Sequence, residues 1–159
     1  MSQPSAIAGV SGQGIAFKAD EVRQLATGKP YVWGGKTPDG FDCSGFVSYV
    51  FKQLFPNQAS SFSMNVAGYM SSSAFDDVAD GDIQPGDIII FPAANGMPNH
   101  IGIVYDKDAW IGSQSSTGTA RVKFSNPFWR QRARKIRRLH VVSPVSVSMG
   151  RVSLDRWVA

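Results

Sequence analysis

The hydrophobic and polar positions change their spacing half-way along the chain. In the first half, apolar residues recur at helical intervals, most clearly over Ser44 to Leu54, a segment that Pro56 ends. Shorter helices are predicted over Asp20 to Thr27, which Gly28 and Pro30 end, and over Ser63 to Met70. The residues Tyr31 to Gly40 between the first two helices are interpreted as a loop.

The second half of the chain carries short β-branched and aromatic runs that predict strands. The runs are Asp87 to Phe91, His100 to Tyr105, Trp110 to Gln114 and Leu139 to Val147, the last long enough for a fourth strand and a fifth. The Ser71 to Pro85 stretch, with its four aspartates, is interpreted as a surface connection. Helices followed by antiparallel strands predict an α+β domain, with the N-terminal helices packed on one face of an antiparallel sheet.

The length of 159 residues, 43% of them apolar, is typical of one globular domain. Small and polar residues dominate Ser2 to Gly14, so we expect a flexible N-terminal tail over residues 1–15 and a single domain over residues 16–159. No apolar run approaches the roughly 20 residues that span a bilayer. The start has no basic region followed by a hydrophobic stretch, so we expect neither a membrane span nor a Sec signal peptide.

The net charge of +4 conceals an uneven distribution. Residues 1–118 carry six Lys and Arg against eleven Asp and Glu, whereas residues 119–159 carry ten against one. Such a basic segment, densest over Arg130 to Arg138, can bind a polyanion, or it can form a solvated face of the domain. The second interpretation is favoured because apolar residues interleave the charges, and nucleic acid is not expected as a partner. These residues are Phe128, Trp129, Ile136 and Leu139.

The candidate chemistry is restricted by the presence of one cysteine, Cys43, and two histidines. An intramolecular disulfide is impossible, and a Cys/His zinc site is not expected. Cys43 is either a small buried apolar residue or a nucleophile at the start of the Ser44 to Leu54 helix. Helix N–H groups would then lower the pKa of its thiol and hold an oxyanion. Of the candidate bases, His100 opens a predicted strand, whereas His140 is interpreted as a sheet histidine.

Four motifs in order carry a resemblance to a known family. They are Tyr31-Val-Trp33-Gly-Gly, Phe41-Asp42-Cys43-Ser44-Gly45-Phe-Val, Pro85-Gly-Asp87 and His100-Ile-Gly-Ile-Val. Over residues 31 to about 114 the chain thereby resembles the NlpC family of cell-wall cysteine peptidases. The resemblance implies a papain-like α+β core in which the cysteine heads a helix packed on the sheet. It also implies catalysis without a metal or an organic cofactor.

The resemblance assigns roles to individual residues. Cys43 is implied as the nucleophile and His100 as the base that later protonates the leaving amine. Tyr31, Asp42 and Ser44 match positions that line the site and hold the free amino end of the substrate, while Trp33 shapes the wall of the cleft. Asp42 can also be a helix N-cap, and Ser44 an ordinary first-turn residue.

The chain departs from the family at the third catalytic position. The family places a polar residue about a dozen positions after the histidine, where this chain has Gly112, or Ile111 if the preceding turn is shorter. Because side chains alternate along a strand, Gln114 shares a face with Gly112 and is our candidate for orienting His100. Ser113 would serve in the other register, or a Cys-His dyad would act alone.

The activity that the resemblance implies is hydrolysis of an amide bond in the stem peptides of bacterial peptidoglycan, typically the D-γ-glutamyl-diaminopimelate bond. We expect a monomer that acts in the periplasm or cell wall. The chain could be an interbacterial effector neutralised by an immunity protein, a phage-type lytic enzyme, or a protein that lost its signal. Two other classes stay open: a thiol acyltransferase on the same fold, and a non-catalytic wall-binding or nucleic-acid-binding module.

Overall fold

A computed structural model describes residues 10–140 of the chain. Helices predominate before residue 72 and strands after it, which is the predicted order. The elements are α1 (Gly12–Leu25), β1 (Lys36–Thr37), β2 (Gly40–Phe41), α2 (Cys43–Leu54), the 3-10 helix η1 (Pro56–Phe62), α3 (Val66–Ser71), β3 (Phe75–Val78), the 3-10 helix η2 (Asp80–Asp82), β4 (Ile88–Phe91), β5 (His100–Val104), β6 (Ala109–Gln114), β7 (Gly118–Lys123), α4 (Pro127–Arg130) and β8 (Lys135–Leu139).

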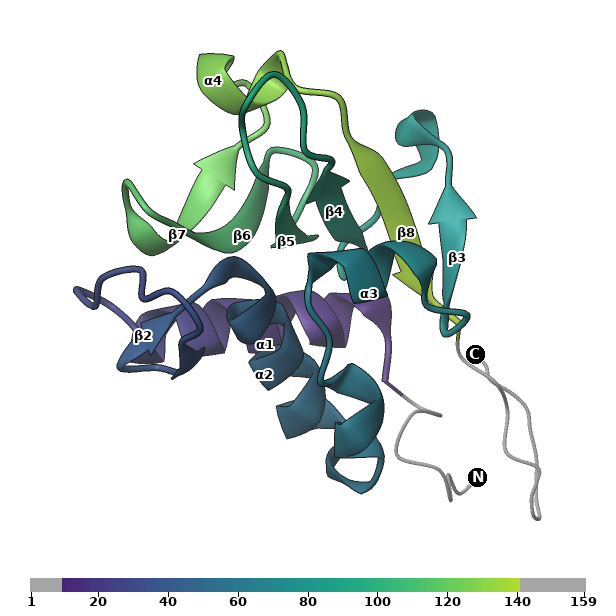
Figure 1. Cartoon of the computed structure of the whole chain (residues 1–159). Coiled ribbons are helices and arrows are strands. Elements are labelled where there is room, and N and C mark those ends of the chain that lie inside the picture. The colour runs from purple at the N-terminus through teal and green to yellow at the C-terminus, as the bar shows by residue number, and fades with distance from the viewer. Residues whose placement is uncertain (1–9, 141–159) are drawn as a thin grey trace.

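Six of the strands form one sheet in the order β3-β8-β4-β5-β6-β7. Every neighbouring pair in it is antiparallel. Helices α1 and α2 lie together on one side of this sheet, and the short helix α4 lies near the opposite side (Figure 1). The predicted α+β architecture is therefore confirmed. None of the helices within residues 10–140 is long and apolar enough to cross a membrane.

Apolar side chains cover both faces of the central strands. In β4, Ile88 and Ile90 join the cluster formed with α1 and α2, whereas Ile89 and Phe91 join a second cluster that includes Trp110 and Trp129. Alternation of side chains along each strand produces this division. Because both faces are covered, β4, β5 and β6 are buried along their whole length, and their sequences are rich in apolar residues.

The first helix begins at Gly12 rather than at Asp20. The Ser11 side chain caps it by accepting a hydrogen bond from the Gly14 amide at 3.0 Å, and Ile15 is buried in the core. Two glycines in the first turn lower the intrinsic helix propensity, but burial of Ile15 and the residues that follow overrides it. Residues 12–15 of the predicted tail are thus helical, while residues 1–9 lie outside the described residues. The assignment of residues 16–159 to one catalytic domain stays a prediction.

The edge of the sheet differs from the predicted pattern. The final strand is β8, at Lys135–Leu139, rather than a strand that starts at Leu139; residues 141–147 lie outside the described residues. The predicted surface connection contains β3, which pairs with β8. A half-buried strand ordinarily alternates apolar and polar residues. Both of these strands have consecutive charged residues instead, so the sequence did not identify them as strands. Opposite charges face each other across the pair instead: Asp77 lies opposite Arg137, and Asp76 opposite Arg138.

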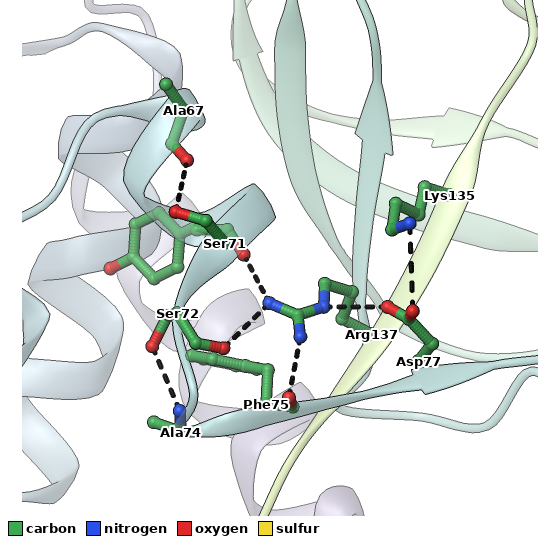
Figure 2. A network of polar contacts seen from close by, with 9 residues as sticks. Ala67, Ser71, Ser72, Ala74, Phe75, Asp77, Lys135 and Arg137 are labelled. Atoms are coloured by element: carbon green, nitrogen blue, oxygen red, sulfur yellow. Dashed lines mark hydrogen bonds and ion pairs between the residues drawn. The ribbon is translucent and has the colours of Figure 1, made fainter.

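Arg137 is a buried member of this edge, only 8% exposed. Its guanidinium donates to the carbonyl oxygens of Tyr69, Ser72 and Phe75 at 2.7–2.9 Å and to the Asp77 carboxylate at 2.9 Å (Figure 2). These contacts join the end of α3 to β3. Most of the neighbouring cations have internal partners too: Arg134 with Asp80, Lys135 with Asp77, Arg138 with Asp87, and Arg132 with two backbone carbonyls. Most cations of the basic segment therefore form ion pairs or hydrogen bonds within the domain.

Candidate active site

Asp42 and Cys43 form the start of α2. The Asp42 carboxylate caps the helix by accepting a hydrogen bond from the Gly45 amide at 2.6 Å, and it also accepts one from the Gly34 amide at 3.1 Å. The second bond ties the loop before β1 to the helix. A side chain at Gly45 would collide with the Gly35 carbonyl, so this glycine allows the loop and the helix to approach closely. The predicted N-cap role of Asp42 is thus observed, and it places Cys43 in the first turn.

His100 is oriented by the side chain of Gln114. The His100 Nε2 atom lies 2.9 Å from Gln114 Oε1, and Gln114 Nε2 donates to Thr117 Oγ1 at 3.0 Å. The Thr117 hydroxyl in turn donates to the Gly118 carbonyl at 2.8 Å. In this series of hydrogen bonds the Gln114 amide nitrogen is the donor to Thr117, so its oxygen Oε1 is the atom that faces His100 and accepts. In a neutral His100, the proton is therefore on Nε2. Nδ1 is then free to accept a proton.

The absence of a side chain at Gly112 provides the space that Gln114 occupies. A Cβ atom at position 112 would lie 2.6 Å from Gln114 Oε1. The residue aligned with the family's third position therefore contributes space, and the polar group comes from two residues further along β6. Ser113, the candidate in the other register, instead donates to the Phe41 carbonyl at 2.8 Å. Ile111 is fully buried in the core.

The electrostatics of the pair differ from the expected lowered thiol pKa. Burial, and after it the charge of Asp42, raise the pKa of Cys43 to about 11, although backbone hydrogen bonds oppose the shift. Burial also lowers the pKa of His100 to about 4; the Gln114 hydrogen bond opposes this shift and the charge of Arg132 adds to it. The expectation was wrong because desolvation of the thiol outweighs the helix N-terminus. Both shifts favour the neutral forms, a thiol at Cys43 and an imidazole at His100.

All seven predicted site residues line one cleft of about 890 Å³. They are Tyr31, Trp33, Asp42, Cys43, Ser44, His100 and Gln114. The Trp33 side chain stands at the rim, with 87% of its surface exposed. Burial and the nearby charges of Cys43 and Asp42 raise the pKa of Tyr31, in agreement with its place in the cleft. His140 lies elsewhere: its Nδ1 is 3.0 Å from an Asp76 carboxylate oxygen, beside β3.

Several residues of the cleft were not predicted from the sequence. The loop between β4 and β5 contributes Met97, Pro98 and Asn99, and the region of α4 contributes Phe128, Trp129 and Arg132. The sequence analysis named Trp129 only as an apolar residue within the basic segment. Apart from its being aromatic, nothing in the sequence indicated that it lines the cleft. Within residues 10–140, no group of three or more His, Cys, Asp or Glu is placed to hold a metal ion.

Comparison with known proteins adds to this geometry. The model of the NlpC/P60 family matches residues 28–138, which include both Cys43 and His100. The chain belongs to the NlpC/P60 family. A relative named "Probable endopeptidase" from Haemophilus influenzae is 32% identical over 127 residues, covering 79% of this chain and 74% of that protein. "Probable endopeptidase YafL" from Escherichia coli is 31% identical over 115 residues, covering 70% of this chain and 45% of that protein.

Solved structures support the same family. The NlpC/P60 domain of the peptidoglycan hydrolase SagA superposes with a TM-score of 0.56 at 26% identity, over 80% of this chain and 98% of that one. NlpC2 from Trichomonas vaginalis gives a TM-score of 0.60 at 23% identity, over 87% of this chain and 48% of that one, and shows the fold alone. The predicted papain-like α+β fold is therefore confirmed.

Proposed function

We propose that this NlpC/P60 domain is a cysteine endopeptidase that hydrolyses an amide bond in the stem peptides of peptidoglycan. The observation that carries the proposal is the cleft that holds Cys43 at the start of α2 together with a His100 oriented by Gln114. The names of its relatives agree with this function: one is a "Probable peptidoglycan endopeptidase LytE" from Bacillus subtilis, 35% identical over 105 residues. The match covers 66% of this chain and 29% of LytE, so the comparison concerns only that part of LytE.

The reaction follows from the protonation states of the pair. His100 Nδ1 accepts the thiol proton of Cys43 as the sulfur attacks the carbonyl carbon of the substrate. Backbone N–H groups at the start of α2 stabilise the developing oxyanion. The imidazolium, held by Gln114 through Nε2, then gives its proton to the leaving amine as the C–N bond breaks. Water, deprotonated by His100, hydrolyses the thioester and restores the thiol. These steps use only protein groups and water.

The proposed scissile bond is the one between D-γ-glutamate and diaminopimelate. Tyr31, Asp42 and Ser44 lie beside Cys43 in the cleft, where they support binding of the free amino end of a stem peptide. The carboxylate of Asp42 provides a negative charge to pair with this ammonium group. Such anchoring would place the second residue of the stem, the D-glutamate, at the sulfur.

The two alternative classes receive less support. A thiol acyltransferase would need an amine or alcohol acceptor in place of water, and the relatives reported above are named as endopeptidases. A nucleic-acid-binding module would need cations directed to solvent. In β8 and the segment before it, most of the cations contact aspartates or backbone carbonyls of the same chain.

The delivery routes suggested above stay predictions, as does the immunity protein. Periplasmic targeting of the protein in a susceptible cell tests the effector hypothesis. Co-expression of a neighbouring open reading frame should then rescue growth. Lysis that no neighbouring product prevents would contradict the effector hypothesis without affecting the proposed enzymatic reaction.

Mass spectrometry of soluble products tests the proposed bond. Purified diaminopimelate-type peptidoglycan is incubated at neutral pH under reducing conditions with the wild type or with Cys43→Ala. We expect the wild type to release fragments whose masses correspond to cleavage after D-glutamate, and we expect none from the variant. Fragments cut at another bond would correct the specificity, and no fragments from either protein would overturn the proposal.

A further inference from the structure

The ring of His100 lies within a cluster of aromatic side chains. Trp129 from α4 stacks on it, with ring centroids 4.7 Å apart and planes inclined by 30°. Trp110 from β6 meets it edge-on at 5.8 Å, and Phe91 from β4 lies at 6.2 Å. Trp129 is the member contributed by the segment between β7 and β8, and it lines the cleft as well. Of the three aromatic residues around His100, it is the one that shares the lining of the cleft with His100.

Arg132 connects this cluster to the loop that leads into β5. Its Nη2 atom donates to the carbonyl oxygens of Pro92 at 3.1 Å and Pro98 at 2.9 Å, near the two ends of the β4–β5 loop. The same guanidinium lies 5.4 Å from the centre of the Trp129 ring and 5.7 Å from that of Phe91. One side chain thus fixes both the loop that precedes His100 and the ring that stacks on it.

We propose that Trp129 and Arg132 are positioning residues for His100. Trp129 fixes the plane of the imidazole and covers it from water, and Arg132 holds Trp129 and the β4–β5 loop in place. The Gln114 hydrogen bond holds the imidazole ring at one atom, Nε2. By itself, this bond does not fix the tilt of the ring plane. Contact with the Trp129 ring fixes the tilt of the imidazole plane, and the direction in which Nδ1 points is then fixed as well. The role in catalysis rests on the proposed function, whereas the effect on His100 can be measured without a substrate.

Loss of either residue changes the surroundings of His100 in a known direction. Burial is the main cause of its lowered pKa, and the charge of Arg132 contributes to it. The other titratable groups around this ring are Cys43, Asp42 and Tyr31, which line the same cleft. Opening the Trp129 side to water stabilises the imidazolium, and removal of the Arg132 charge does the same. Both changes should raise the pKa of His100.

Titration of the two histidines by NMR tests the proposal. His140 is exposed, paired with Asp76, and serves as an internal control in the same spectrum. We expect Trp129→Ala to increase the proton affinity of His100 about tenfold or more, and Trp129→Phe to have a smaller effect. Phe17→Ala removes an exposed aromatic residue of α1 that is not among the residues lining the cleft, and it should leave the titration unchanged.

Two Arg132 variants separate charge from position. Arg132→Met removes the charge and both carbonyl bonds, so it should raise the pKa of His100 and lower kcat on a stem peptide more than it raises KM. Arg132→Lys keeps the positive charge but not the guanidinium geometry that reaches both carbonyls. We therefore expect kcat to fall while the pKa of His100 stays close to that of the wild type. If Trp129→Ala does not fold, Arg132→Met decides by the same titration. An unchanged His100 titration in folded Trp129→Ala or Arg132→Met would overturn the proposal, even if the wild type cleaves peptidoglycan.

Discussion

Cys43 and His100 lie in surroundings that keep both side chains neutral at neutral pH. The thiol is buried beside the Asp42 carboxylate, and the imidazole is buried among aromatic rings. Helix N-terminal charge alone favours a thiolate, but here desolvation is the larger effect. In the proposed reaction we therefore expect the proton to move during the attack of sulfur on the substrate, and not before substrate binding.

This assignment predicts how alkylation of Cys43 depends on pH. With the pKa of Cys43 raised to about 11, the thiolate fraction increases throughout the neutral and mildly alkaline range. With that of His100 lowered to about 4, imidazolium forms only in acid. The rate of reaction with iodoacetamide should therefore rise by about tenfold per pH unit between about pH 6 and 9. Cys43 is the only thiol of the chain, so the signal is unambiguous. A plateau that begins in acid would reveal a preformed ion pair and contradict the assignment.

The space above Gly112 predicts a specific effect on His100. Gly112→Ala places a methyl group 2.6 Å from Gln114 Oε1 and 3.0 Å from the Trp110 ring, so the Gln114 amide has to move. Its hydrogen bond to His100 would then be lost or bent, and kcat should fall ~10- to 100-fold. Gly81→Ala is the matched control, because a Cβ there meets no atom within 4 Å. Wild-type kcat in Gly112→Ala would show that Gln114 does not orient the base.

How far the sequence determines the site depends on the range of the contacts. Cys43 and His100 stand in local motifs, and alternation along a strand pointed to Gln114 once Gly112 was taken as the aligned position, with Ser113 as the candidate in the other register. Trp129 and Arg132 reach His100 only through the path of the chain from β7 to β8, and no local pattern encodes that path. The thiol pKa was mispredicted for a related reason, because burial is a property of the folded molecule.

At the scale of elements, Asp20 attaches α1 to the far strand of the sheet. Its carboxylate accepts hydrogen bonds from Arg23 at 2.7 Å and from two nitrogens of Arg121 in β7 at 2.9 Å. These guanidinium groups hold the pKa of Asp20 well below its ordinary range. A carboxylate with a lowered pKa stabilises the fold above its ordinary pKa, and this contribution is lost as the pH falls toward the lowered value.

Asp20→Asn should therefore lower the free energy of unfolding near neutral pH and reduce its dependence on acid. Because Arg121 is partly exposed, we expect a loss of about 1–2 kcal/mol at pH 7 and a smaller difference from the wild type near pH 2. Urea unfolding at both pH values provides the measurement. Glu21→Gln, at an exposed neighbour paired with Lys18, is the control. A difference from the wild type that is the same at both pH values would contradict the pairing.

The elements themselves were predictable where one pattern dominated. The helix from Cys43 and strands β4, β5 and β6 carry clear apolar periodicity and were predicted. Strands β3, β7 and β8 were missed because their residues are largely polar or charged and their stability comes from pairing with neighbours. Strands β1 and β2, in and at the end of the predicted Tyr31 to Gly40 loop, were missed because each has only two residues. The start of α1 was missed because its glycines and its N-cap resemble a loop until the packing of Ile15 is known.

Over the whole molecule, acidic residues from the first part of the sequence form ion pairs with basic residues from the last part. Asp77 on β3, Asp80 on η2 and Asp87 just before β4 pair with four cations on β8 or directly before it, namely Arg134, Lys135, Arg137 and Arg138. The Arg134–Asp80 and Lys135–Asp77 pairs are largely exposed and contribute little each, whereas Asp87, the partner of Arg138, is buried. Arg137 is buried as well, and it satisfies three backbone carbonyls (Figure 2).

Arg137→Met should consequently destabilise the protein by about 3 kcal/mol, since it leaves three carbonyls at the junction of α3 and β3 without a donor. Arg134→Ala removes an exposed pair with Asp80 and should cost less than about 1 kcal/mol. Denaturant unfolding of both variants measures the difference. Equal effects would show that Arg137 is no more important than a surface charge, and that the edge of the sheet is held by other contacts.

The central claim is that Cys43 performs thiol hydrolysis of a peptidoglycan stem. The most direct test is the rate at which wild type and Cys43→Ala release L-alanyl-D-glutamate from a soluble L-alanyl-D-γ-glutamyl-diaminopimelate tripeptide. We expect steady release by the wild type and none above background by the variant, with circular dichroism showing that both are folded. Release by folded Cys43→Ala at the wild-type rate, or no release by either protein, would contradict it.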